Sequence, residues 1–379
     1  MRSFLKYLLI FVVVLFIFCE SGEKKLKIGL IAPLTGDVKT FGESVKNAFL
    51  LAIEEANQKG GILGKKIEYV ICDDKNDPTE AANAAYKLIN QDKVNAIIGS
   101  VASKASIPVS EICEQNKIVM ITPTSTNPKV TIREDGTRKI YIFRACFIDP
   151  FQGKVAATFA LNNLKAKTAA ILYDVGNDYV KGLAEFFKTS FEEGGGKIVL
   201  FESYQKDDVD FSALLTKVKQ VNPDILFLPD YYTKVGLIAK QARQLGITAT
   251  LMGGDGWDSP ELPKIAGEAI EGGYFTNHYS PEDPRKEVQE WVRKYQERYG
   301  KIPDALATLA YDATILLLTA IEKANSFEPE KIRKALSEIK EFNTVSGKIV
   351  FDENGNPIKD AVIMQYKNGK ATYVTTIHP

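Results

Sequence analysis

Histidine and cysteine, the residues that most often hold transition metals in proteins, are scarce in this chain. Among 379 residues only His278 and His378 are histidines, and neither has a cysteine beside it. A zinc site needs several such ligands at close spacing, so the sequence predicts no metal centre. A Ser-His-Asp triad could use only these two histidines, His278 being the more plausible, and no G-x-S-x-G nucleophile elbow is present. We therefore predict no catalytic residues and a protein that is not an enzyme.

The chain also lacks an excess of charge of either sign. Forty-eight basic residues balance forty-eight acidic ones, and no basic run stands out. Proteins that bind nucleic acid usually carry a basic face, so we predict no nucleic-acid partner. The composition, 45% hydrophobic and 25% charged, is that of an ordinary globular protein. Its length suits two domains of roughly 150 residues each.

Glycine-rich phosphate-binding motifs are incomplete. At Gly60–Lys66 the spacing of the phosphate loop is wrong, and Lys66 stands where the motif needs a hydroxyl residue. Gly254-Asp-Gly256 begins a dinucleotide-like pattern, but Ser259 occupies the place of the third glycine. We therefore predict no cofactor. The adjacent acids Asp73 and Asp74 end a predicted strand and are interpreted as turn formers.

The N-terminus has the pattern of an export signal. Arg2 and Lys6 precede the apolar run Tyr7–Phe18, which at twelve residues is too short to cross about 30 Å of hydrocarbon as a helix. This predicts a signal peptide over residues 1–22 and an exported protein. Cys19 follows the run, where lipoproteins carry their lipidated cysteine, yet no small side chains precede it. Lipidation of Cys19 and ordinary cleavage after Ser21 both stay open.

Three further cysteines, Cys72, Cys113 and Cys146, lie in apolar segments without C-x-x-C spacing. An odd number spread in this way is not a disulfide framework. We interpret them as packing residues, since free cysteine behaves as a small hydrophobe. One disulfide between two of them remains open.

After Lys25, short apolar runs alternate with longer amphipathic segments. Strands are predicted at Leu26–Ala32, Ile67–Cys72, Ala96–Gly99 and Ile118–Ile121, and helices at Glu43–Gln58, Thr79–Asn90 and Ser103–Glu114. Such alternation predicts helices packed on a mainly parallel sheet, whose buried strands are continuously apolar.

The same cycle restarts near residue 150. Strands are predicted at Ala169–Tyr173, Lys197–Phe201, Ile225–Leu228 and Thr250–Met252, and helices at Tyr179–Glu193, Phe211–Lys219 and Lys234–Leu245. Helices dominate Pro284–Lys340, and strands return at Gly347–Phe351, Val362–Tyr366 and Thr372–Ile377. Two α/β cycles predict two similar lobes, and the late strands suggest that the chain crosses between them more than once.

A long series of motifs carries a resemblance to a known family. They are Ile28-Gly-Leu-Ile-Ala-Pro-Leu-Thr-Gly36, Ala52-Ile-Glu-Glu-Ala-Asn57, Gly60-Gly-Ile-Leu-Gly-Lys-Lys66, Met120-Ile-Thr-Pro-Thr-Ser-Thr-Asn-Pro128 and Phe351-Asp-Glu-Asn-Gly355. In this order and spacing the chain resembles the periplasmic leucine/isoleucine/valine-binding proteins, over essentially everything after residue 25. The resemblance implies two Rossmann-like lobes joined by three hinge crossovers near residues 146, 279 and 357. The first lobe would combine residues 26–146 with 280–356, and the second 147–279 with 357–379.

The same resemblance implies a non-enzymatic subunit of an ABC importer. Such a protein captures an amino acid, here expected to be branched-chain, and delivers it to a membrane permease. The protein would then act, as a monomer, in the periplasm or at the outer face of the cytoplasmic membrane. The alternative is a ligand-sensing module of the same fold for an amide, urea or aromatic acid. No effector domain follows Pro379 in the sequence, which favours the importer subunit.

Ligand contacts follow residue by residue from the family pattern. Ser103 and Thr126, with the backbone at Thr124, are expected to hold the ligand carboxylate, and Asp255 is expected to pair with its ammonium. A plain helix N-cap is the alternative role for Ser103, and a solvated turn for Asp255. Tyr179 and Tyr231 match aromatic positions of the second lobe. Phe41 and Trp257 are candidates for the side-chain pocket, or else core residues.

Two departures from the family pattern bear on these expectations. Asn76 and Ala102 stand where some relatives have a cysteine pair, so that disulfide is not expected. Trp257, and Lys104 after Ser103, are bulkier or more charged than in several relatives, which leaves the side chain of the ligand open.

Overall fold

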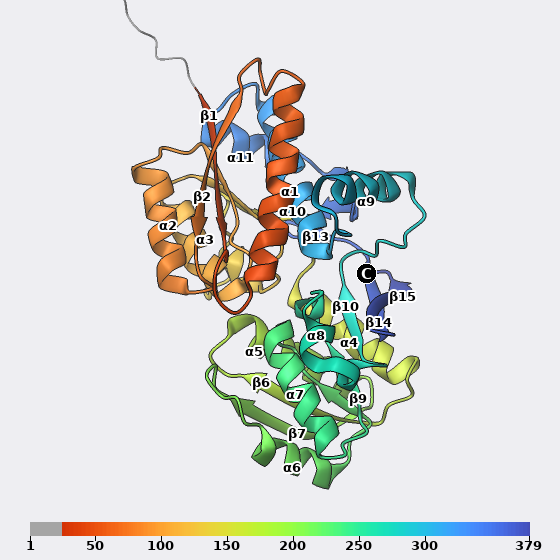
Figure 1. Ribbon diagram of the computed structural model, residues 1–379. Helices are drawn as coiled ribbons and strands as arrows, with labels where there is room; N and C mark the ends of the chain where they lie inside the picture. The colour runs from red at the N-terminus through yellow and green to blue at the C-terminus, as the bar shows by residue number, and fades with distance from the viewer. Residues whose placement is uncertain (1–24) are drawn as a thin grey trace, which may run out of the picture.

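Two sheets organise the part of the chain that the computed structural model describes, residues 25–379 (Figure 1). The first has the strand order β2-β1-β3-β4-β5, and all its neighbouring pairs are parallel. Its strands are β1 (Leu26–Ala32), β2 (Ile67–Asp73), β3 (Ala96–Ile98), β4 (Val119–Thr122) and β5 (Ile142–Arg144). The inner strands β3 and β4 are buried throughout, which accounts for their unbroken apolar sequence.

Helices from both ends of the chain cover this sheet. They are α1 (Lys39–Gln58), α2 (Pro78–Asn90), α3 (Ser103–Gln115), α9 (Lys286–Tyr299), α10 (Ala305–Ala324) and α11 (Pro329–Ser337), with the 3-10 turn η1 (Pro128–Val130). α10 packs along α1 and reaches β3 and β4, so the late helical segment completes the first lobe. Local chemistry sets the helix ends. At α2, for example, Asp77 accepts hydrogen bonds from the backbone N–H groups of Thr79 and Glu80, and Pro78 takes the first helical position.

The second sheet has the order β15-β14-β10-β9-β8-β6-β7, and its neighbouring pairs are parallel except β10–β14 and β14–β15, which are antiparallel. Its strands are β6 (Thr168–Asp174), β7 (Lys197–Tyr204), β8 (Ile225–Phe227), β9 (Thr250–Gly253), β10 (Tyr274–Asn277), β14 (Ala361–Lys367) and β15 (Lys370–Ile377). Around it lie α4 (Asp149–Asn162), α5 (Asp178–Glu193), α6 (Ser212–Val221), α7 (Tyr232–Gln244), α8 (Leu262–Ala266), η2 (Asp255–Trp257) and η3 (Gly267–Ile270). This is the predicted α/β architecture of two lobes with mainly parallel sheets.

The chain passes between the lobes at three places. These lie between β5 and α4, between β10 and α9, and between β13 and β14, and the residues near 146, 279 and 357 fall close to them. A small antiparallel sheet of β11 (Glu341–Thr344), β12 (Gly347–Phe351) and β13 (Pro357–Ile358) precedes the third passage. The exact lobe boundaries, residues 26–146 with 280–356 and residues 147–279 with 357–379, stay a prediction.

Sequence periodicity missed α4, β5 and β10. The buried positions of α4 are spread around the helix, because it is enclosed by α5 and the second sheet, so no amphipathic stripe marks it. Its Gly153 lets α5 come close: a Cβ there would lie 2.7 Å from the Cβ of Phe186. β5 and β10 have three and four residues, which is too short for a periodic signal.

Helix α10 is the one helix in residues 25–379 that is long and apolar enough to cross a membrane. In the fold, 78% of its apolar window is buried, as expected for the core helix of a lobe.

Candidate functional site

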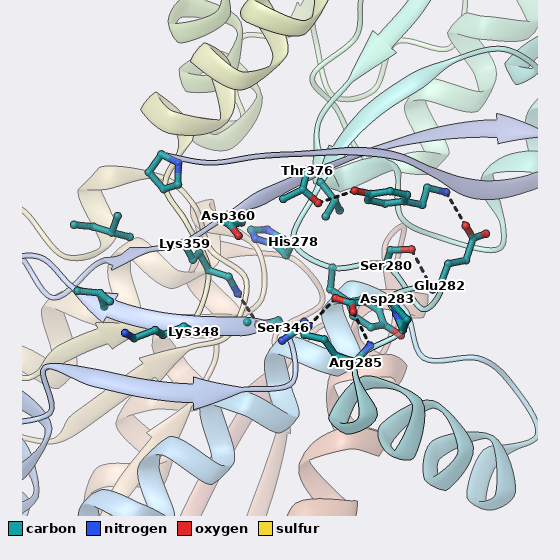
Figure 2. Close-up of a pocket in the computed structure, with 18 residues that line it drawn as sticks. His278, Ser280, Glu282, Asp283, Arg285, Ser346, Lys348, Lys359, Asp360 and Thr376 are labelled. Carbon is teal, nitrogen blue, oxygen red and sulfur yellow. Dashed lines mark hydrogen bonds and ion pairs between the residues drawn. The ribbon is translucent and has the colours of Figure 1, made fainter.

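A large cavity lies beside the passages between the lobes and has a volume of about 800 Å³. Figure 2 shows its walls, where charged side chains mostly pair with other protein groups. Arg285 Nε lies 2.8 Å from Asp283 Oδ2, and Lys359 Nζ donates to Ser346 Oγ at 2.5 Å. None of the predicted contact residues lines this hinge cavity.

A smaller cavity between the lobes gathers most of the predicted contacts. Phe41, Ser103, Thr124 and Leu306 line it from the first lobe, and Tyr179, Tyr231 and Asp255 from the second. Its volume is about 20 Å³, room for about one water molecule. A molecule larger than water could therefore enter this cavity only if the lobes moved apart.

The first lobe presents uncharged hydrogen-bonding groups to this cavity. Ser103 is the first residue of α3, directly after the loop that follows β3, and its Oγ accepts a hydrogen bond from the Asn127 backbone N–H at 3.3 Å. The N-cap of α3 is Ala102, so the capping role considered for Ser103 is wrong. The Thr124 hydroxyl donates to the Val101 carbonyl at 2.8 Å. The first N–H groups of a helix have no partner inside it, and together with the Ser103 hydroxyl they suit an anion, whereas the Thr124 hydroxyl gives its one hydrogen to Val101.

Aromatic rings close the cavity on its apolar side. Tyr179 and Tyr231 stack with centroids 5.3 Å apart and planes 8° from parallel. Across the cleft, Phe41 of α1 meets Tyr231 edge-on at 5.8 Å and Tyr232 at 5.0 Å. Leu306, at the start of α10, adds an aliphatic side chain that sequence reasoning did not identify.

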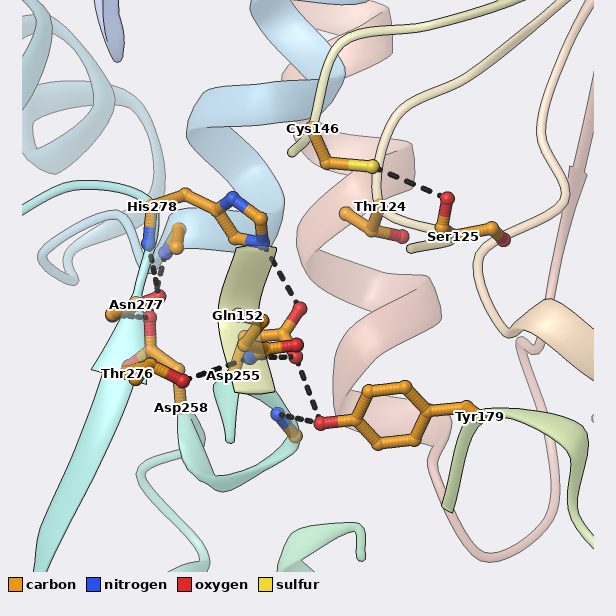
Figure 3. A network of polar contacts seen from close by, with 12 residues as sticks. Thr124, Ser125, Cys146, Gln152, Tyr179, Asp255, Asp258, Thr276, Asn277 and His278 are labelled. Carbon is orange, nitrogen blue, oxygen red and sulfur yellow. Dashed lines mark hydrogen bonds and ion pairs between the residues drawn. The ribbon is translucent and has the colours of Figure 1, made fainter. Parts of the chain in front are cut away.

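Asp255 lies at the centre of a polar network in the second lobe (Figure 3). Its Oδ1 accepts hydrogen bonds from Tyr179 OH and Gln152 Nε2, each at 2.8 Å. Its Oδ2 lies 3.0 Å from His278 Nε2. The side chain is thus held in the cleft by groups from α4, α5 and the end of β10. The alternative of a solvated turn aspartate is wrong, since only 9% of Asp255 is exposed.

The network keeps Asp255 ionised despite its burial. Burial raises the pKa of this carboxyl, but the hydrogen bonds that it accepts from His278, Gln152 and Tyr179, together with the charge that His278 carries when it is protonated, outweigh this effect. The net pKa lies below the ordinary value of an aspartate. The cavity therefore offers a fixed negative charge.

Gly254, directly before Asp255, leaves room for the side chains that donate hydrogen bonds to Asp255. A Cβ at Gly254 would lie 2.6 Å from Tyr179 OH and 2.9 Å from Gln152 Nε2. Since real Cβ atoms do not approach so closely, glycine is needed here for the two donors to reach Asp255.

Trp257 and Thr126 do not line the cavity. Trp257 is fully buried, its Nε1 donates to the Leu228 carbonyl at 2.9 Å, and it belongs to the core of the second lobe. The Thr126 hydroxyl is buried without a hydrogen bond of standard geometry. It lies near Asp149, whose pKa rises to about 8 because of burial, with Thr126 and Arg144 opposing the shift and Asp255 adding to it.

Sequence reasoning missed Gln152 and His278 as parts of the site. Gln152 lies on α4, the helix without a periodic signal. His278 follows β10 and was considered only as a catalytic base. The rarity of histidine in this chain was the one feature that could have drawn attention to His278. Nothing in the sequence linked it to Asp255, which lies 23 positions earlier.

The three cysteines within residues 25–379 are free thiols, and Cys113 and Cys146 are buried. Burial raises the pKa of the Cys146 thiol to about 12, which fits a packing role. In the same range no group of three or more His, Cys, Asp and Glu side chains could hold a metal ion. The signal peptide and Cys19 lie outside the described residues.

Comparisons with known proteins agree on one family. The family model described as periplasmic binding protein matches residues 25–371. A Leu/Ile/Val-binding protein, BraC3 of Rhizobium johnstonii, is 38% identical over 89% of this chain and 90% of its own. A leucine-, isoleucine-, valine-, threonine- and alanine-binding protein of Pseudomonas aeruginosa is 36% identical over 87% of each chain.

Solved structures agree as well. The leucine binding protein LivK of Thermotoga maritima has 44% identity and a TM-score of 0.88, covering 93% of this chain and 99% of its own. The branched-chain amino acid transporter substrate binding protein LivJ of Streptococcus pneumoniae, solved with isoleucine, has 32% identity and a TM-score of 0.88. That match covers 94% of this chain and 100% of the other.

Proposed function

The chain belongs to the periplasmic binding protein family, and from that premise we propose that it is the extracytoplasmic binding subunit of an ABC importer for branched-chain amino acids. One observation carries the choice of ligand. The cavity between the lobes sets the ionised Asp255 opposite uncharged hydrogen-bond donors, and this arrangement suits a zwitterion.

Each part of an amino acid has a matching group in the cavity. The ligand ammonium would pair with Asp255. The carboxylate would accept hydrogen bonds from Ser103 and the first N–H groups of α3, with Thr126 and the backbone at Thr124 nearby. Because Asp255 carries a full charge, a ligand with a carboxylate and no amine, such as an aromatic acid, would be repelled. This disfavours the alternative of an aromatic-acid sensor.

The apolar wall supports a branched aliphatic side chain. Phe41, Tyr231 and Leu306 enclose the space beyond the polar groups and offer nothing for a second charge. The relatives that are named for leucine, isoleucine and valine support the same choice. Trp257 lies in the core, so its size does not restrict the ligand.

Cellular placement follows from the family and from the N-terminal pattern. We propose that the protein is exported, acts as a monomer outside the cytoplasmic membrane, and passes its ligand unaltered to a permease. Anchoring through a lipidated Cys19 is an additional proposal, which mass spectrometry of the mature N-terminus would test.

A thermal-shift screen tests the proposed ligand class. L-Leucine, L-isoleucine and L-valine should each raise the melting temperature, because a ligand that binds only the native state stabilises it by mass action. Benzoate, urea and the amine-free acid isovalerate should not. Small-angle scattering should show compaction on adding leucine, and chromatography should recover the leucine unchanged.

Stabilisation by benzoate or urea, with no response to any amino acid, would reject the proposal. Conversion of leucine to a product in excess over the protein would instead show that the protein is an enzyme.

A further inference from the structure

His278 contacts the charged end of the proposed ligand site without lining the cavity between the lobes. An ionised carboxylate offers about four acceptor positions, two on each oxygen. On Asp255, Tyr179 and Gln152 occupy both positions of Oδ1, and His278 occupies one of Oδ2. The position left for a ligand ammonium is therefore on Oδ2, directly beside the imidazole.

The surroundings of His278 favour its neutral form. Because a carboxylate only accepts, Nε2 must carry hydrogen toward Asp255. In neutral imidazole Nδ1 is then an acceptor, and in this structure it is buried without a partner. A proton on Nδ1 would be a buried donor with nothing to receive it. Burial lowers the pKa of His278, and although Asp255 opposes this, the pKa stays below the ordinary value.

His278 also connects the site to the segments that join the lobes. Its ring stacks on Phe147, with centroids 3.7 Å apart, and Phe147 lies in the first passage between the lobes. His278 itself begins the second passage, and Lys359 in the third passage is close enough to lower its pKa. The charged groups that face the imidazole are therefore Asp255 and Lys359. The charge of Asp255 also raises the pKa values of Asp149 on α4 and of Asp258, after the larger effect of their burial.

We propose that His278, while it is neutral, leaves the full negative charge of Asp255 available to the ligand ammonium. Protonation of His278 should therefore weaken amino-acid binding. A cationic imidazole 3.0 Å from Oδ2 would neutralise the carboxylate and repel a second cation beside it. His278 is thus a positioning residue that makes the site sensitive to acid. The inference rests on the proposed function, in which Asp255 holds the ammonium.

This arrangement determines in which direction ligand binding and the protonation of His278 affect each other. A bound ammonium disfavours imidazolium, so leucine should lower the pKa of His278, and binding should release a proton from any protonated fraction. Affinity should rise with pH up to the pKa of His278 in the ligand-free protein and then level off. Below that pKa, it should fall by up to about tenfold for each pH unit.

The two histidines of this chain make the test direct. In tag-free protein the imidazole C–H signals can be followed by NMR between about pH 5 and pH 8, with and without L-leucine. The variants His278→Gln and His378→Gln assign the signals. Glutamine keeps an N–H donor for Asp255 but does not titrate, and His378, paired with Asp360 on the exposed surface, is the matched control.

Leucine should lower the pKa of His278, and the imidazole signals of His378 serve as the internal reference. Titration calorimetry should show that His378→Gln binds leucine as the natural protein does and keeps the weakening in acid, whereas the affinity of His278→Gln no longer falls in acid. Asp149 and Asp304, whose pKa values burial raises to about 8 and about 7, titrate in the same range, so the comparison with His278→Gln isolates the histidine.

An unchanged pKa of His278 in protein that binds leucine would overturn the inference. So would an acid weakening that persists in His278→Gln. If that variant fails to fold, the NMR titration of His378→Gln still decides the question. No binding of leucine at any pH would instead defeat the proposed function.

Discussion

The two faces of the cleft carry different chemistry. The first lobe contributes hydroxyls and the start of α3, all uncharged, whereas the second contributes one carboxylate surrounded by three donors. The first face is formed by loops after parallel strands, where helix N–H groups are exposed. The second face is a network that joins α4, α5, η2 and β10.

This difference explains why a zwitterion can hold the lobes together. Its carboxylate finds donors on one lobe and its ammonium finds a charge on the other, so neither lobe alone can satisfy both ends. A ligand that bridges the faces stabilises the closed state by its differential affinity for that state. The substitutions below change one face at a time.

The largest expected effect comes from removing the charge of the second face. Asp255→Asn should weaken leucine binding by about two to three orders of magnitude, because breaking a buried ion pair costs about 3–5 kcal/mol. Titration calorimetry measures the loss, and circular dichroism checks the fold. Glu185→Gln, which removes an exposed carboxylate from the same lobe, should bind normally. A loss under threefold in folded Asp255→Asn would place the ammonium elsewhere.

The Ser103 hydroxyl of the first face comes next. Ser103→Ala should fold and bind leucine about tenfold to a hundredfold more weakly, since it loses a hydrogen bond to a charged group worth about 1.5–3 kcal/mol. Thr189→Ala, which removes an exposed hydroxyl, is the control. Natural affinity in folded Ser103→Ala would show that the carboxylate binds at another place.

The stacked tyrosines of the second face should respond unequally. Tyr179→Phe removes a donor to Asp255 and should weaken leucine binding about tenfold. Tyr231→Phe should change it by less than about threefold, because the Tyr231 hydroxyl makes no hydrogen bond of standard geometry. Calorimetry on the pair measures the difference. Equal losses would mean that the Tyr231 hydroxyl also contributes to binding, and no loss in either variant would mean that both rings act only through packing.

The smallest effect on binding is expected for Trp257→Phe. The indole lies in the core, so the change should lower the free energy of unfolding by about 1–3 kcal/mol and alter leucine affinity by less than about threefold. Urea denaturation and calorimetry measure the two quantities separately. A large loss of leucine affinity with an unchanged free energy of unfolding would show that Trp257 contacts the ligand.

Elements with strong local patterns could be predicted from the sequence. The range Leu26–Ala32 was predicted and found as β1, and α5 begins one residue earlier than expected. Helix α4 was missed because it is enclosed on several sides and shows no periodic stripe. Gln152, its contribution to the network, was missed with it.

The site itself could be predicted only in part. Phe41, Ser103, Thr124, Tyr179, Tyr231 and Asp255 came from the family pattern, and the structure brings all six to one cavity. The pattern could not distinguish Asp255 from Trp257, two positions apart. In the one-turn helix η2 these side chains point in different directions, one into the cleft and one into the core.

The sequence by itself determined the strands and helices that have a strong apolar pattern, such as β1 and α5, since apolar periodicity is a local property of the chain. It also determined the scarcity of metal ligands and of excess charge. Only the tertiary structure decided that Gln152, Tyr179 and His278, from three separate segments, meet at Asp255 and keep it ionised. Such a meeting depends on how helices pack on the sheet and how the chain passes between the lobes. The energy of a buried charge then depends on those distant partners, which no local pattern records.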